Sequence, residues 1–219
     1  ERVTESGNVL RELLATEGIT LAGVDVDART GAYVDDRRSG DRVRLCEMEP
    51  DHLGRHDIDE LYSSFLALAA SADVAVVVGP VRDGILREDT YERLARDIHT
   101  LRVPLVADLD RRWLRSAAQG GTTIVKVSDE DLLGDGVTRP EIGTVCDTAR
   151  DLLDLGAGAV VVSRAEEPGI ALLGRELRPD GVREYALHGP VLSVVDHHGA
   201  GDSMTAGMAA ALAHALDIE

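Results

Sequence analysis

The chain has 219 residues and a formal net charge of −17, a length that supports one sizeable hydrophobic core. The acidic balance argues against nucleic acid or an anionic membrane as a partner, and no apolar run is long enough to cross a bilayer. Only two cysteines, Cys46 and Cys146, are present and they lie far apart. With no recognisable signal peptide, we expect a cytoplasmic protein whose thiols are reduced and buried.

The first part of the chain is expected to form a helix and a small sheet. Apolar residues at helical spacing predict a helix over residues 7–17, ended by Gly18. Loose alternation predicts a strand over residues 19–26, and two further strands, 30–34 and 42–48, are expected to form a hairpin around a glycine-containing turn. Because these strands precede any regular alternation of strands and helices, we expect a separate small sheet beside the main domain.

From residue 57 onward, apolar strands alternate with amphipathic helices. We predict helices over residues 58–70, 87–101, 111–118, 128–133, 141–155 and 203–216, and strands over 73–78, 104–107, 122–127, 159–162, 169–173, 182–187 and 191–195. Buried strands that alternate with helices of this length predict a mostly parallel α/β sheet with helices on both faces. Ligands bind such sheets at the carboxyl ends of the strands. Those ends are Gly79, Asp108, Lys126 to Asp131, Ser163 and Asp196 to Asp202.

The last of these ends, residues 196–202, reads DHHGAGD and precedes a helix of small residues. Its glycines let the backbone approach a ligand, and the first N–H groups of the helix point at negative charge. Asp202 would repel a phosphate there unless it accepts the proton of an attacking hydroxyl. An ordinary helix cap explains the same aspartate. His197 and His198 are adjacent and share no face of a strand, so we expect no zinc site.

This pattern resembles the C-terminal signature of the ribokinase-like (PfkB-type) carbohydrate kinases, in particular the phosphofructokinase-like branch. The resemblance implies transfer of a phosphoryl group from ATP, with Mg²⁺, to a hydroxyl of a sugar or sugar phosphate. Gly199, Ala200 and Gly201 would form the anion hole for the transferred phosphate, and Asp202 would be the general base and contact the substrate. Asp196 and Gly201 would also contact the nucleotide.

The same resemblance implies the architecture and the substrate contacts. It implies a ribokinase-like three-layer α/β sandwich with a mostly parallel sheet, a core over residues 57–219 and a small β lid over 19–48. Members of the family are longer at both ends, so residues 1–219 would be an incomplete single kinase domain. The lid is a possible homodimer contact. Arg29 and Gly79 would contact the sugar. Read without the family, Arg29 is favoured as a solvated charge, and a plain strand-end turn explains Gly79 equally well.

Residues 126–132, KVSDEDL, resemble the family's Lys-Pro-Asn-x-x-Glu-Leu segment. The resemblance implies that Ser128 and Asp131 hold Mg²⁺, Asp131 through water, and that Lys126 reaches the transferred phosphate. Read without the family, Ser128 is a helix N-cap followed by acidic residues, and Lys126 is a snorkelling side chain at a sheet edge.

The segment from Ser163 to Gly169 resembles the family's Ser/Thr-x-Gly-x-x-Gly turn beside the nucleotide, with Ala165 at the first glycine. The resemblance implies that Ser163 and Gly169 contact the nucleotide. Two functions stay open. The intact 196–202 signature favours an active sugar or sugar-phosphate kinase. The altered metal segment and the altered turn favour a non-catalytic ligand-binding or regulatory relative with the same fold.

Overall fold

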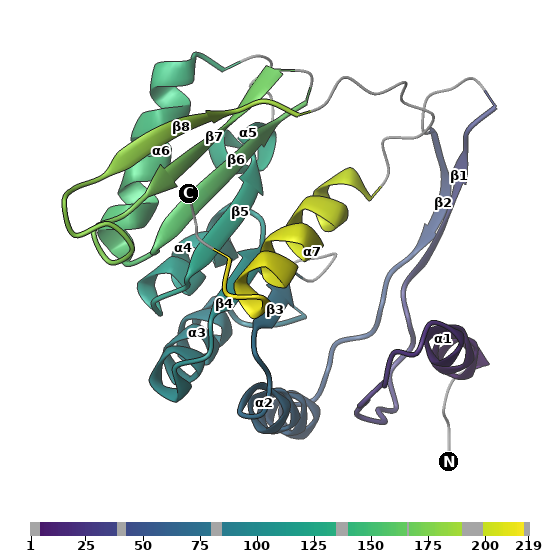
Figure 1. Cartoon of the computed structure of the whole chain (residues 1–219). Coiled ribbons are helices and arrows are strands. Elements are labelled where there is room, and N and C mark those ends of the chain that lie inside the picture. The colour runs from purple at the N-terminus through teal and green to yellow at the C-terminus, as the bar shows by residue number, and fades with distance from the viewer. Residues whose placement is uncertain are drawn as a thin grey trace. The chain divides into compact units, whose positions relative to one another are not determined.

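The computed structural model describes residues 5–38, 43–79, 85–134, 140–165, 167–189 and 199–216. The chain divides into two compact units (Figure 1). The first comprises Glu1–Phe65 and Arg82–Leu86, and the second comprises Leu66–Val81 and Arg87–Glu219.

The first unit contains helix α1 (Glu5–Thr16) and a two-stranded antiparallel sheet of β1 (Ala32–Asp36) and β2 (Val43–Met48). Helix α2 (Arg55–Ala69) begins in this unit. The pairing of β1 with β2 confirms the predicted strands of the hairpin, and its turn at residues 39–42 lies outside the described residues.

Two expectations for this part of the chain are wrong. Residues 19–26 form no strand, because alternating side chains supply only a preference and a strand also needs a neighbour to accept its backbone hydrogen bonds. The small sheet therefore has two strands rather than three. Cys46 is a free thiol on β2, every residue of which is exposed, and the free thiol of Cys146 is only half-buried.

The second unit is built on a six-stranded sheet with the order β3-β4-β5-β6-β7-β8. Its strands are β3 (Ala75–Val78), β4 (Leu105–Asp108), β5 (Ile124–Ser128), β6 (Ala159–Arg164), β7 (Glu167–Leu173) and β8 (Arg183–Leu187). Its helices are α3 (Glu88–Leu101), α4 (Arg111–Gln119), α5 (Asp129–Leu133), α6 (Ile142–Leu155) and α7 (Ala200–Ala213). Neighbouring strands from β3 to β6 are parallel, whereas β7 is antiparallel to β6 and to β8.

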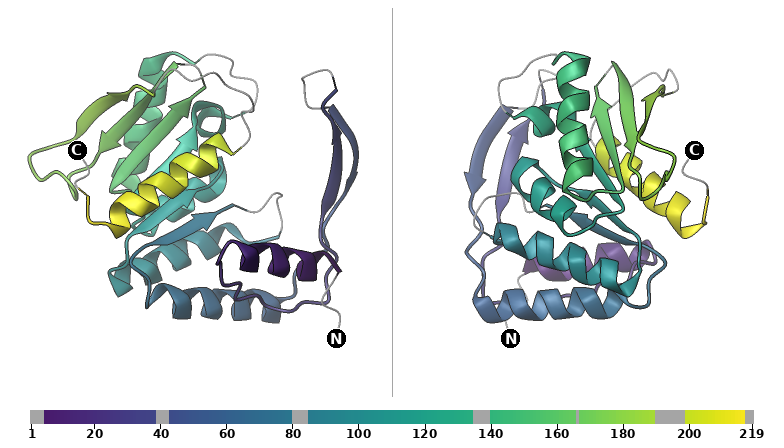
Figure 2. Two further views of the ribbon diagram at one scale, coloured as in Figure 1. Left: turned by 45° about the vertical axis from the view of Figure 1, so that its right-hand side comes forward. Right: turned by 90° about the vertical axis from the view of Figure 1, so that its left-hand side faces the viewer.

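The sheet lies between two helical layers, as the two views in Figure 2 show. Helix α7 covers one face, and α3, α4 and α6 lie on the other (Figures 1 and 2). On the α7 side, a core cluster joins Ala209 of α7 to side chains of the central strands. Those strand residues are Val106, Ile124, Ala159, Val161, Ala171 and Leu173. The predicted sandwich is confirmed, because short apolar strands alternate with helices that each bury one face.

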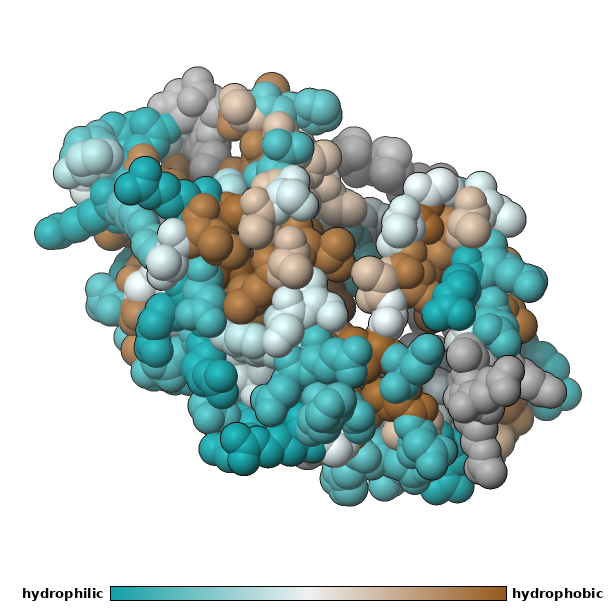
Figure 3. Space-filling model, turned by 90° about the horizontal axis from the view of Figure 1, so that it is seen from below, coloured by the Kyte–Doolittle hydropathy of each residue, from teal (hydrophilic) through white to brown (hydrophobic). Residues whose placement is uncertain are grey.

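The edge strand β3 departs from the expectation that strands of the sheet are buried on both faces. Val76 and Val78 are 37% and 60% exposed, while Ala75 and Val77 are buried. On the face that Figure 3 shows, apolar residues gather in patches among polar ones. Among the described helices, none combines the length and the apolar character that a bilayer crossing requires.

Close packing of α3 against the end of α4 generates a testable prediction. A Cβ added to Gly120 would overlap the carbonyl oxygen of Glu92 and lie 2.5 Å from the Cβ of Ala95. Gly120→Ala should therefore lower the free energy of unfolding by roughly 1–3 kcal/mol, because the backbones must separate.

Gly143→Ala is the matched control, because a Cβ at this helical glycine meets nothing within 4 Å. It should raise stability by about 0.5 kcal/mol, since alanine favours helices. Urea unfolding of both variants makes the comparison. Equal effects of the two substitutions would contradict the close approach of α3 and α4.

Candidate active site

The register of the sheet brings two opposite charges together at the carboxyl ends of β4 and β5. Asp108 pairs with Lys126 across these parallel strands, two residues after the pair of Val106 and Ile124. Val106 and Ile124 belong to the core cluster on the α7 side. Because side chains on one face of a strand recur every second residue, Asp108 and Lys126 also point toward α7.

Asp108 and Lys126 form an ion pair that is largely shielded from water. The ammonium nitrogen of Lys126 lies 3.1 Å from Oδ2 and 3.3 Å from Oδ1 of Asp108. The Lys126 side chain is 8% exposed and the Asp108 side chain is 19% exposed. A buried charge requires a partner, and Asp108 supplies it. Lys126 therefore does not snorkel at a sheet edge: β5 is an interior strand of the sheet.

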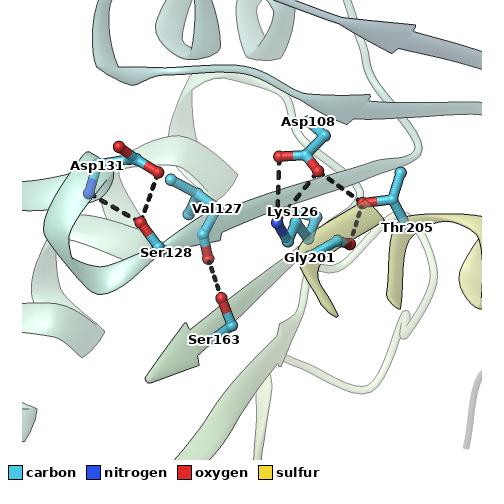
Figure 4. Close-up of polar contacts among 8 residues, drawn as sticks. All are labelled: Asp108, Lys126, Val127, Ser128, Asp131, Ser163, Gly201 and Thr205. Atoms are coloured by element: carbon cyan, nitrogen blue, oxygen red, sulfur yellow. Dashed lines mark hydrogen bonds and ion pairs between the residues drawn. The ribbon is translucent and has the colours of Figure 1, made fainter. Parts of the chain in front are cut away.

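Helix α7 begins at this ion pair, as Figure 4 shows. Its N-cap residue is Gly199, whose φ of 74° lies in the left-handed region that favours glycine. The helix starts at Ala200, before the predicted residue 203. Asp202 is exposed in the first turn. Because Gly199 holds the N-cap position, the alternative in which Asp202 itself is the N-cap residue does not apply.

Gly201 and Thr205 connect α7 to the ion pair. A Cβ at Gly201 would lie 2.7 Å from the ammonium nitrogen of Lys126, so the ammonium packs directly against this glycine. The Thr205 hydroxyl oxygen lies 2.7 Å from Asp108 Oδ2 and 3.1 Å from the Gly201 carbonyl oxygen. The sequence identifies Asp108 only as the end of a strand and does not single out Thr205. Thr205 follows Gly201 by one helical turn, and this spacing places it on the same side of the helix as Gly201. To use the spacing, the register of β4 with β5 must be known, because that register places Asp108 beside Lys126.

Ser128 and Asp131 lie at the start of α5. Ser128 is the N-cap residue: its hydroxyl oxygen accepts a hydrogen bond from the Asp131 backbone N–H at 3.0 Å. The same hydroxyl donates to Asp131 Oδ2 at 2.5 Å. This reciprocal arrangement is like a capping box. Among the described residues, no group of three or more His, Cys, Asp and Glu side chains is placed to hold a metal ion. The proposed magnesium contacts of Ser128 and Asp131 stay a prediction.

The β6–β7 hairpin lies beside α5. Ser163 pairs in register with Ser128, and its hydroxyl lies 3.5 Å from the carbonyl oxygen of Val127. At the hairpin turn, Ala165 has a φ of 37°, in the region where glycine is favoured. This strain is consistent with the glycine that the resembled family carries at that point. Close packing explains why residue 169 is a glycine, because a Cβ there would lie 3.0 Å from the Val162 carbonyl oxygen.

The other predicted site residues are distributed as follows. Asp196, with His197 and His198, lies outside the described residues. Gly79 follows β3, and its N–H donates to the Asp108 carbonyl oxygen at 3.2 Å. Arg29 belongs to the first unit. Its backbone N–H and its guanidinium each donate to Asp51 at 2.9 Å, and these bonds hold the pKa of Asp51 below its ordinary value.

The fold, a mostly parallel six-stranded α/β sandwich, is that of the ribokinase-like class. Residues 4–219 match the family described as pfkB family carbohydrate kinase, and the chain belongs to this family. A 1-phosphofructokinase of Bacillus subtilis (strain 168) is 25% identical over 217 residues, which are 98% of this chain and 67% of that protein. The expected resemblance is therefore confirmed.

Solved structures support the same fold. Phosphofructokinase-2 from Escherichia coli in complex with potassium superposes with a TM-score of 0.78 at 21% identity, over 97% of this chain and 67% of that one. Ribokinase of Arabidopsis thaliana complexed with ribose and ATP gives a TM-score of 0.65 at 17% identity, over 98% and 67%. At these low sequence identities, the superpositions show that the folds are similar and nothing more.

The contact between Gly201 and Lys126 generates a prediction. Gly201→Ala should displace the Lys126 ammonium, because its Cβ would lie 2.7 Å from Nζ. Lys126 is the only lysine in residues 1–219. In protein labelled with [¹³C]lysine, its CεH₂ signal, identified by its loss in Lys126→Arg, should move.

Gly207→Ala in the same helix is the control, because a Cβ at Gly207 meets nothing within 4 Å. It should leave the lysine signal in place and stabilise the helix by up to about 1 kcal/mol. An unmoved signal in folded Gly201→Ala protein would show that the ammonium does not pack against residue 201.

Proposed function

We propose that this protein transfers the γ-phosphoryl group of ATP to a hydroxyl group of a sugar phosphate. Relatives named 1-phosphofructokinase and phosphofructokinase-2 support this class of acceptor. The observation that carries the proposal is the Lys126 ammonium packed against Gly201, in the first turn of α7. A lysine ammonium and the free N–H groups of a helix start both attract anions. Asp202, exposed in the same turn, supplies a base beside that anion site.

The proposed reaction assigns a role to each of these groups. The acceptor hydroxyl gives its proton to the Asp202 carboxylate while its oxygen bonds to the γ-phosphorus of ATP. The bond from that phosphorus to the bridging oxygen breaks, and ADP leaves with the bonding electrons. The ammonium of Lys126 and the backbone N–H groups of residues 199–201 stabilise the negative charge on the transferred phosphoryl oxygens.

The nucleotide and the metal are assigned to neighbouring segments. Ser163 and Gly169 would lie beside the nucleotide, together with Asp196. The oxygen atoms of Ser128 and Asp131 suit Mg²⁺, a hard cation that keeps several of its waters. When bound, Mg²⁺ would neutralise phosphate charge. These two side chains would orient its water molecules.

Substrate contacts and assembly are further parts of the proposal. Arg29 and Gly79 are the proposed sugar contacts. Exposed apolar side chains on β1 and β2 support the homodimer that the resemblance implies. These side chains are Tyr33, Val34, Val43, Leu45 and Met48. A cytoplasmic location stays a prediction.

A non-catalytic relative is the second candidate. The hydrogen bonds between Ser128 and Asp131 favour it, because they give both side chains a structural role without a metal. Turnover of Mg²⁺-ATP with a panel of sugars and sugar phosphates decides between the two, with the protein at its natural length.

The role of Asp202 is tested by Asp202→Asn. We expect the turnover number to fall by roughly 10²–10⁴-fold, because the amide cannot accept the proton. Asp202 is exposed, so the melting temperature should change little. Steady-state kinetics and thermal unfolding measure both quantities.

Asp89→Asn is the matched control, since Asp89 is an exposed aspartate in the first turn of α3. It should retain wild-type turnover. If Asp202→Asn keeps more than about a tenth of the wild-type rate, Asp202 is not the general base.

The metal assignment is tested by magnesium titrations of Asp131→Ala, Asp131→Glu and Ser128→Asn. Asp131→Ala should raise the magnesium concentration required for half-maximal activity, whereas Asp131→Glu and Ser128→Asn should be tolerated. Asparagine caps helices as well as serine does, so the Ser128→Asn variant keeps the structural role. A lower melting temperature without a change in magnesium requirement would make Ser128 and Asp131 structural residues only.

A further inference from the structure

We infer that Thr205 is a positioning residue for phosphoryl transfer: through Asp108, its hydroxyl sets where the Lys126 ammonium stands relative to the first turn of α7. This inference rests on the proposed function. Thr205 lies in the second turn of α7 and is 3% exposed. It touches neither the proposed nucleotide segment nor the base Asp202 through any hydrogen bond described above, so its action would pass through Asp108 and Lys126.

The first step is the direction of the Thr205 hydrogen bond. A threonine hydroxyl has one proton to donate. It lies 2.7 Å from the Asp108 carboxylate and 3.1 Å from the Gly201 carbonyl oxygen. Bonds to an ionised acceptor are shorter and stronger than bonds to a neutral one. The proton therefore goes to Asp108, and the hydroxyl joins α7 to the end of β4 (Figure 4).

The second step is the sharing of one carboxylate oxygen. Oδ2 of Asp108 accepts from Thr205 at 2.7 Å and from Lys126 at 3.1 Å. Two donors on one oxygen fix the orientation of the carboxylate, and the carboxylate in turn fixes the ammonium. All three side chains are largely buried, so water does not substitute easily for a missing donor.

The third step connects the ammonium to the phosphate site. The Lys126 ammonium has three N–H donors and, among the described residues, it bonds to the Asp108 carboxylate, which leaves donor capacity for an anion. It stands against Gly201, at the start of α7. Without the Thr205 hydroxyl, Lys126 would be the one of these two donors left on Asp108 Oδ2, and α7 would lose its hydrogen bond to Asp108 at the end of β4. The distance between the ammonium and the helix N–H groups would then no longer be fixed.

The local contact with the Gly201 carbonyl oxygen, at 3.1 Å, does not by itself explain a hydroxyl at this position. Threonine is a weaker helix former than alanine, and a buried hydroxyl in a helix usually bonds back to the preceding turn, which slightly destabilises the helix. Valine has nearly the same shape and would fill the same space. The hydroxyl is therefore explained by its bond to Asp108.

The experiment compares Thr205→Val, which removes the hydroxyl and keeps the shape, with Thr205→Ser, which keeps the hydroxyl. For Thr205→Val we expect a 10–100-fold loss of kcat/KM for ATP, with the KM for the sugar phosphate unchanged. Thr205→Ser should stay within threefold of wild type. Thr148→Val in α6 is the matched control, because the Thr148 hydroxyl bonds to the Thr144 carbonyl oxygen one turn back, at 2.9 Å. It should keep wild-type kinetics.

A second measurement needs no turnover. In [¹³C]lysine-labelled protein, the CεH₂ signal of Lys126 should move in Thr205→Val and keep its wild-type position in Thr205→Ser and Thr148→Val. If Thr205→Val folds poorly, Thr205→Ala is measured in the same two ways. A wild-type protein that is folded but inactive would overturn the proposed function, and the lysine spectra would still decide whether Thr205 positions Lys126.

Two results would overturn the inference. One is an unmoved lysine signal with wild-type kcat/KM in Thr205→Val, even with a lower melting temperature, since that combination makes Thr205 a structural residue only. The other is equal damage in Thr205→Ser and Thr205→Val, because the hydroxyl would then not be the group that matters.

Discussion

The site depends on one interaction, the shielded ion pair between Asp108 and Lys126. An ammonium placed at the start of a helix is electrostatically unfavourable, because the helix N-terminus carries partial positive charge. Asp108 offsets part of this repulsion and leaves one side of the ammonium facing Gly201. A bound phosphate would satisfy both the ammonium and the helix. The arrangement therefore favours an anion at this place, in a chain whose net charge of −17 would otherwise repel one.

Helix α7 is attached to the sheet in two different ways. Along its length it packs through apolar residues: Ala209 lies in the core cluster, with Met204, Met208 and Leu212 against it. Near its first turn it is held by the Thr205 hydrogen bond to Asp108. Apolar packing has no directional preference, whereas a hydrogen bond fixes an orientation. The polar contact thus lies where the proposed chemistry needs a defined geometry.

The neighbouring segments extend this organisation across the sheet. Ser128 ends β5 and caps α5, and the β6–β7 hairpin is tied to α5 by the ion pair of Arg164 with Asp129 at 3.7 Å. Both of these side chains are mostly shielded, at 11% and 15% exposed. The proposed metal segment and the proposed nucleotide turn are therefore connected to each other and, through β5, to Lys126.

The sequence by itself determined the elements and the family. Local periodicity predicted the described helices and strands of the second unit because burial of one face imposes a fixed repeat on each, and residues 196–202 carried the resemblance. The predicted strand over residues 191–195 lies outside the described residues. Local periodicity failed where a partner decides the outcome. Residues 19–26 alternate like a strand but pair with none of the described strands. Cys46 is exposed because it lies on the two-stranded sheet of β1 and β2, and local sequence preference does not determine whether other residues pack against that sheet. The sequence named Lys126, Gly201 and Asp202 as site residues, and the tertiary structure decided which other side chains contact them. Asp108, Lys126 and Thr205 are distant in the chain. The register of β4 with β5 and the packing of α7 on the sheet place them within hydrogen-bonding distance.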